Sequence, residues 1–170
     1  QFYHASFTQL EFRNDYNLTE NLIEAFTSPH VFISSIIDDV NPVYFQVQFD
    51  GSNQQFDFGV ITHSVDQNQS ISITYSTQEL GFCVNGEKVE DFQIEGSTLI
   101  ECRYHPSKNK VSFADSKHSS RVFSCKLSTK SQCSFIALIH PGTKLNYACT
   151  FKPSTDCFQK NIHFRQIAHP

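Results

Sequence analysis

Several features common in enzymes and membrane proteins are missing from this chain of 170 residues. It has no Met and no Trp, and only six Gly and six Pro. Its apolar runs last only a few residues, far short of the roughly 20 that cross a bilayer, so we expect no membrane-spanning segment and no membrane partner. With 39% hydrophobic and 18% charged residues, the composition is typical of a globular protein.

Sequence motifs of catalysis and metal binding are also absent. The chain contains no G-x-S-x-G elbow, no P-loop, no G-x-G-x-x-G and no H-E-x-x-H. It has eight His and six Cys, but no C-x-x-C pair and no spacing typical of structural zinc. We therefore predict a protein that is not an enzyme and that uses no cofactor and no metal.

Strand patterns dominate what is present. In Val43–Phe49 a large apolar side chain occupies every second position, which is the period of a half-buried strand. Further apolar, strand-like runs are Phe56–Ile61, Ile71–Tyr75, Leu99–Tyr104, Lys110–Phe113, Arg121–Leu127, Ser134–Ile139 and Lys144–Phe151. Many short strands separated by turns predict an antiparallel sandwich or barrel.

Turn-forming residues separate these runs. Asn85-Gly86 is typical of a tight hairpin, and Pro141-Gly142 suits a type II turn. Leu18–Ala25 fits either one helical turn, capped by Thr19, or a strand. No linker or repeat divides the chain, so we predict one domain over residues 1–170, with a core built from its seventeen Phe residues.

The cysteines leave two interpretations open. Four of them (Cys83, Cys102, Cys125 and Cys149) sit inside apolar runs, where Cys is commonly a reduced core residue, and this favours an intracellular protein. Six cysteines together with sequons at Asn17 and Asn68 instead favour a secreted, lectin-like adhesion domain.

Charge is distributed unevenly along the chain. Residues 1–102 hold two basic and fifteen acidic residues, for −13, whereas residues 103–170 hold eleven basic and two acidic residues, for +9. Acidic and basic strands that neighbour one another would neutralise this difference. The alternative is a nucleic-acid-binding module with a basic face, whose candidate residues are Lys108, Lys110, Lys117, Arg121, Lys126 and Lys130.

The order of the segments resembles the SPRY (B30.2-type) domain over residues 17–151. Val43–Phe49 is similar to the family's "YFEVEI" strand, Phe56–Thr62 to its "VGVAT" segment, and Phe82–Lys88 to its "NG" hairpin. Residues 92–102, 108–113, 135–139 and 144–147 follow with similar matches, in the family's order. The family's Trp is absent and Ser97 replaces the Asp of its "GD" pair, so the resemblance is to a divergent member.

The resemblance implies a two-layer antiparallel bent β-sandwich of the concanavalin-like, SPRY type. It also implies a protein or peptide partner bound by loops at one end of the sandwich, in a domain of a larger intracellular protein such as a ubiquitin-ligase adaptor or a scaffold. We expect the isolated domain to be monomeric. Carried onto this chain, the binding residues are Thr27, Ser28, Pro29, His30, His63, Ser64, Tyr75, His140, Pro141 and Gly142. On this hypothesis His30, His63 and His140 converge on one surface.

Overall fold

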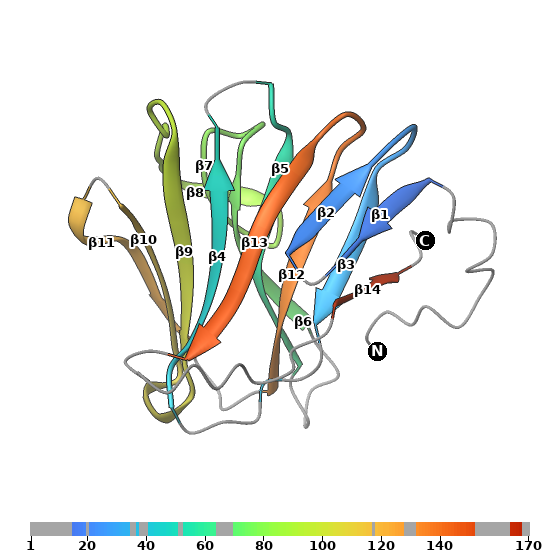
Figure 1. Cartoon of the computed structure of the whole chain (residues 1–170). Coiled ribbons are helices and arrows are strands. Elements are labelled where there is room, and N and C mark those ends of the chain that lie inside the picture. Colours follow the sequence, from blue (N-terminus) through green and yellow to red (C-terminus); the bar gives the residue numbers. More distant parts are fainter. Residues whose placement is uncertain are drawn as a thin grey trace.

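Two antiparallel sheets of seven strands each form the protein (Figure 1). The computed structural model describes residues 15–19, 21–34, 37, 41–50, 53–63, 70–116, 118–127, 132–151 and 164–167, with the backbone alone at 63, 118–121, 149–151 and 164–167. In spatial order, the first sheet contains β1 (Tyr16–Leu18), β2 (Leu22–Ala25), β13 (Lys144–Phe151), β4 (Val43–Phe49), β9 (Thr98–His105), β10 (Lys110–Asp115) and β11 (His118–Lys126). The second contains β14 (Phe164–Ile167), β3 (His30–Ser34), β12 (Gln132–Ile139), β5 (Phe56–His63), β6 (Ser70–Ser76), β7 (Gly81–Val84) and β8 (Glu87–Asp91).

The predicted all-β, two-layer antiparallel sandwich is therefore confirmed. In the described part of the chain the only helical element is the short 3-10 helix η1 (Pro106–Lys108). No helix among the described residues is long and apolar enough to cross a membrane.

The segment at residues 18–25 is a β-hairpin and not a helical turn. Leu18 pairs with Ile23 across the turn that joins β1 to β2. The amide of Asn21 still donates to Thr19 Oγ1 at 3.4 Å, so the predicted contact of Thr19 forms in a different element. The helical alternative was wrong because Ile23 and Ala25 point into the core with a period of two, and this burial decides in favour of the strand.

Aromatic side chains from both sheets fill the core, as the Phe content predicted. Phe45 of β4 meets Phe58 of β5 edge-on, with 5.5 Å between the ring centroids. Phe82 of β7 stacks on Phe123 of β11, with centroids 4.6 Å apart and planes within 7°. Because these pairs join opposite sheets, the rings hold the two layers together.

Cysteine side chains contribute to this packing. Cys83, Cys102 and Cys133 are buried, and Cys125 is half-buried. Cys83, Cys125 and Cys133 are free thiols. Burial raises the pKa of Cys133 to about 11 and so favours its protonated form at neutral pH. The Cys149 side chain and Asn68 lie outside the described residues.

The tight turns have the conformations that their sequences indicate. Asn85 and Gly86 both have positive φ, at 53° and 82°, as a type I′ hairpin requires. Gly142 has a φ of 80°, which fits the Gly position of a type II turn.

Strand register defines two ends of the sandwich. Ile139, the last residue of β12, pairs with His30 and Phe56, the first residues of β3 and β5. The connections β2–β3, β4–β5, β6–β7, β8–β9 and β12–β13 therefore all emerge at one end, uppermost in Figure 1, which we call the His140 end. The connections β5–β6, β7–β8 and β9–β10 emerge at the opposite end.

Candidate functional site

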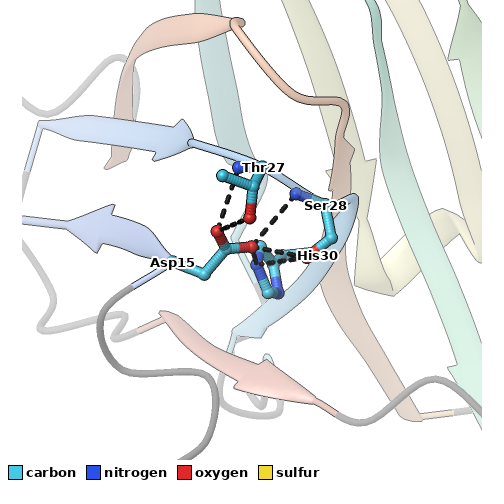
Figure 2. A network of polar contacts seen from close by, with 4 residues as sticks. All are labelled: Asp15, Thr27, Ser28 and His30. Atoms are coloured by element: carbon cyan, nitrogen blue, oxygen red, sulfur yellow. Dashed lines mark hydrogen bonds and ion pairs between the residues drawn. The ribbon is translucent and has the colours of Figure 1, made fainter.

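A carboxylate network fixes the β2–β3 loop at the His140 end (Figure 2). Asp15 accepts hydrogen bonds from the backbone amides of Thr27 and Ser28 at 3.0 and 3.1 Å, and from both of their hydroxyl groups. His30 Nε2 lies 2.6 Å from Asp15 Oδ2, and since an ionised carboxylate only accepts, this nitrogen carries the proton. The hydroxyl groups of Ser28 and Thr27, and then His30, hold the pKa of Asp15 well below its usual range.

Other hydrogen bonds connect the remaining loops of this end. The amide of Gly142 donates to Ala25 O at 3.0 Å, and Gln54 Nε2 donates to Lys144 O at 3.0 Å. Ser97 Oγ donates to Asp50 O at 3.1 Å, and so links the β8–β9 and β4–β5 connections. The loops therefore form a platform held in place by the two sheets.

Two large apolar side chains in the described parts of these loops are exposed. Phe26 in the β2–β3 loop is 46% exposed, and Leu80 in the β6–β7 turn is 48% exposed. Leu80 also has a φ of 53°, a left-handed conformation that is uncommon and strained for a bulky residue. Of the residues predicted for the site, Thr27, Pro29, Pro141 and Gly142 are exposed here, while Ser28 and His140 are partly buried.

Two buried polar atoms lie at the same end of the second sheet. Asp57 Oδ1 and His140 Nε2 have no hydrogen-bond partner among the residues that the structure describes. Burial raises the pKa of Asp57, against a hydrogen bond from Ser76 and the nearby His140 ring. Both residues belong to the rim of the platform, because Asp57 is the second residue of β5 and His140 directly follows β12.

Three of the sequence-predicted site residues, His30, Tyr75 and His63, do not lie on this surface. His30 and Tyr75 are each only 1% exposed. The Tyr75 hydroxyl donates to Phe92 O at 2.9 Å inside the core, and burial raises its pKa to about 12. Since neither ring reaches the surface, neither can contact a partner, and the prediction that they line the binding face is wrong.

His63 lies at the wrong end of the molecule for the predicted convergence. It pairs with Gln132 at the start of β12, whereas Phe56 pairs with Ile139 at its end. These seven residue steps separate His63 from the His140 end by roughly 23 Å. The three histidines therefore do not converge, and Ser64 lies outside the described residues.

Three of the six residues proposed for nucleic-acid binding lie together in the structure, and the other three are described only in part or not at all. Lys108, Lys110 and Lys126 lie together at the opposite end, around the β9–β10 connection. Only the backbone of Arg121 is described, and Lys117 and Lys130 lie outside the described residues. No group of three or more His, Cys, Asp or Glu side chains in the described ranges could hold a metal ion.

Sequence reasoning missed Asp15, Phe26, Asp57 and Leu80. Phe26 directly follows the inward-facing Ala25, so strand periodicity alone would have placed it outward. Asp15 carried no comparable signal, because its partners begin twelve residues later in the chain.

Comparisons with known proteins agree with this architecture. No protein-family model matches the chain, and no curated protein matches it. Among solved structures, a human SPRY domain matches with a TM-score of 0.51 and 13% identity, covering 79% of this chain and 94% of that one. The SPRY domain of human HERC1 matches with a TM-score of 0.51 and 10% identity, covering 83% of this chain and 97% of that one. A structure named sialidase has a TM-score of 0.45, too low to carry an inference. By fold, the chain is a SPRY-like domain.

Proposed function

We propose that this chain is a non-catalytic recognition domain that binds a protein or peptide through the loops of the His140 end. SPRY-like folds are typical of protein-interaction modules, which supports the general role. The proposal includes one domain over residues 1–170, monomeric when isolated, that serves a larger intracellular protein as a substrate-recognition or scaffold unit. A ubiquitin ligase is one such protein.

The observation that carries the proposal is the pair of exposed apolar side chains, Phe26 and Leu80. Interfaces commonly depend on a few apolar anchors surrounded by polar contacts. The two loops are separated by three strand spacings, from β3 to β6, or roughly 14 Å. One partner surface of ordinary size, about 800 Å², covers both. Thr27, Ser28, Pro29, His140, Pro141 and Gly142 would then supply the surrounding contacts.

A competition experiment tests this proposal. A photo-crosslinking residue at Thr27 or Pro141 should form an adduct with a specific partner, and excess unlabelled wild-type domain should suppress that adduct. The double variant Phe26→Ser/Leu80→Ser should compete at least tenfold less well, since it lacks both anchors. Val89→Ser is the matched control, because Val89 is 55% exposed on β8 and belongs to no loop of the His140 end. Equal competition by the double variant and the wild type would refute the proposal.

A further inference from the structure

The apolar anchors Phe26 and Leu80 share the His140 end with several carboxylates. Asp50 follows β4, Asp57 is the second residue of β5, and Glu79 directly precedes Leu80. Asp50 and Glu79 are exposed, and Asp57 is partly exposed. None of the ion pairs among the described side chains involves any of these three residues. The described part of this end therefore carries negative charge beside its apolar anchors.

Two described lysine side chains reach the same end, and each lies beside a carboxylate. Lys88 Nζ is 2.7 Å from Asp91 Oδ1, and it also donates to the backbone oxygen of Glu79 at 3.1 Å. Lys144 lies directly across from Glu24 on the neighbouring strand. The two lysines therefore offset two carboxylates of this end, and the three named above remain in excess.

Asp57 adds a second observation to this excess of charge. Its side chain faces outward, because its neighbours Phe56 and Phe58 are fully buried in the core. Its Oδ1 atom is buried and has no hydrogen-bond partner among the described residues, and the same holds for Nε2 of the nearby His140. Burial raises the pKa of Asp57, and the negative charge of Glu79 adds to this shift. Because Asp57 is partly exposed, a cation from outside can approach it and offset both effects.

Asp57 also lies between the two anchors. Ser76 is directly across from Asp57 on β6, and its hydroxyl oxygen accepts a hydrogen bond from the Glu79 amide at 3.2 Å. This bond holds the turn that carries Leu80 next to Asp57. On the other side of β5, β12 separates it from β3, the strand that follows the loop with Phe26. A segment that contacts both anchors therefore passes over Asp57.

We propose that the partner segment bound at the His140 end is basic and places a Lys or Arg side chain beside Asp57 and Glu79. Apolar residues on either side of it contact Phe26 and Leu80. This inference rests on the proposed function and adds the chemistry of the partner. The loops of the two anchors are roughly 14 Å apart, which an extended segment spans in about four residue steps. Alternate residues of such a segment share one face, so a basic residue midway between two apolar ones matches this surface.

Selection from a phage-displayed library of random dodecapeptides on the immobilised full chain tests the inference. Retained peptides should carry Lys or Arg at least twofold more often than the unselected library. Synthetic copies of these peptides should bind the chain in fluorescence anisotropy, and several-fold more weakly at 200 mM salt than at 50 mM, because salt screens exposed charges. Their binding should also lower the pKa of Asp57 measured by NMR, which a purely apolar contact would not do.

Matched charge reversals locate the contact. Glu79→Lys should weaken binding of the selected peptides at least tenfold, because it replaces an attraction by a repulsion beside Leu80. Glu87→Lys is the control and should leave the affinity within twofold. Glu87 is also exposed, but it begins β8 at the end of the sandwich opposite His140. Equal weakening by the two variants, or a library from which no peptide is retained, would overturn the inference.

The variant Phe26→Ser/Leu80→Ser separates failure of this inference from failure of the proposed function. Peptides that lose affinity for this variant but carry no excess of Lys or Arg would overturn the inference and leave the proposed function standing. Basic peptides that bind this variant as tightly as the wild type would instead overturn the role of the two anchors, and the inference with it.

Discussion

At the scale of single residues, Asp15 shows how one carboxylate can organise a loop. It satisfies two backbone amides, two hydroxyl groups and one imidazole, which no neutral side chain of the same size could do. The β2–β3 loop, which is predicted to recognise a partner, is therefore held in place by Asp15, a residue outside the loop.

Asp15→Asn should destabilise the protein by roughly 1–3 kcal/mol, because the amide loses the charge-assisted bonds and cannot accept at its nitrogen. Urea unfolding at pH 7 measures this loss. The control is Asp50→Asn, whose side chain is exposed at the same end and should change stability by less than about 0.5 kcal/mol.

The same substitution predicts a pH dependence. The folded pKa of Asp15 lies below the ordinary value of 3.8, so the stability it contributes is present above pH 3.8 and is lost as the pH falls further. The difference between wild type and Asp15→Asn should therefore shrink below about pH 4. A difference that stays constant down to pH 2.5 would contradict this origin of the stability.

Asp57 should have the opposite effect on stability as the pH changes. Its pKa is raised by burial, so the ionised carboxylate lowers stability at pH 7 and this cost disappears as the pH falls toward 3.8. Asp57→Asn should raise the free energy of unfolding at pH 7 by about 1 kcal/mol, with a smaller gain near pH 4. Asp91→Asn, exposed and 2.7 Å from Lys88, is the control and should change stability little. Lower stability of Asp57→Asn at pH 7 would contradict this prediction, because it would mean that the hydrogen bond from Ser76 outweighs the cost of burial.

At the scale of strands, alternation within one segment was readable from the sequence, and pairing between segments was not. The bounds predicted for Val43–Phe49 coincide with β4, because a period of two is a local property. In a strand, residues two positions apart lie on the same face, so Tyr75 shares the buried face of Ile73 and His30 shares that of Phe32. The burial of Tyr75 and His30 could therefore have been predicted. The end at which His63 emerges follows from the antiparallel pairing of β5 with β12, which puts the last residues of the two strands at opposite ends, and no local pattern encodes that pairing.

Substitution of Phe82 tests the packing of β7 against the first sheet. Its ring contacts Phe113 and Phe123 of the first sheet, with centroids at 5.0 and 4.6 Å, although β7 belongs to the second sheet. Phe82→Ala should cost about 3–5 kcal/mol, because it opens a cavity between the layers. Leu80→Ala, two residues earlier and half exposed, should cost less than about 1 kcal/mol in the same chemical denaturation. Similar costs for the two variants would mean that Phe82 does not bridge the sheets.

At the scale of the whole molecule, the sandwich was predictable and the surface that it presents was only partly so. Segment order indicated loops at one end, and the β2–β3 and β12–β13 connections do emerge together there. Phe26 and Leu80 were missed because exposure follows from the packing of all the neighbouring elements.

The central claim is that partners bind at the His140 end, and hydrogen–deuterium exchange of the domain with and without a bound partner tests it most directly. Binding should slow exchange in residues 26–29, 77–80 and 140–143, and should leave the β7–β8 turn at Asn85-Gly86 unchanged. Slowed exchange at Asn85-Gly86 together with unchanged exchange in the three loops would contradict the claim.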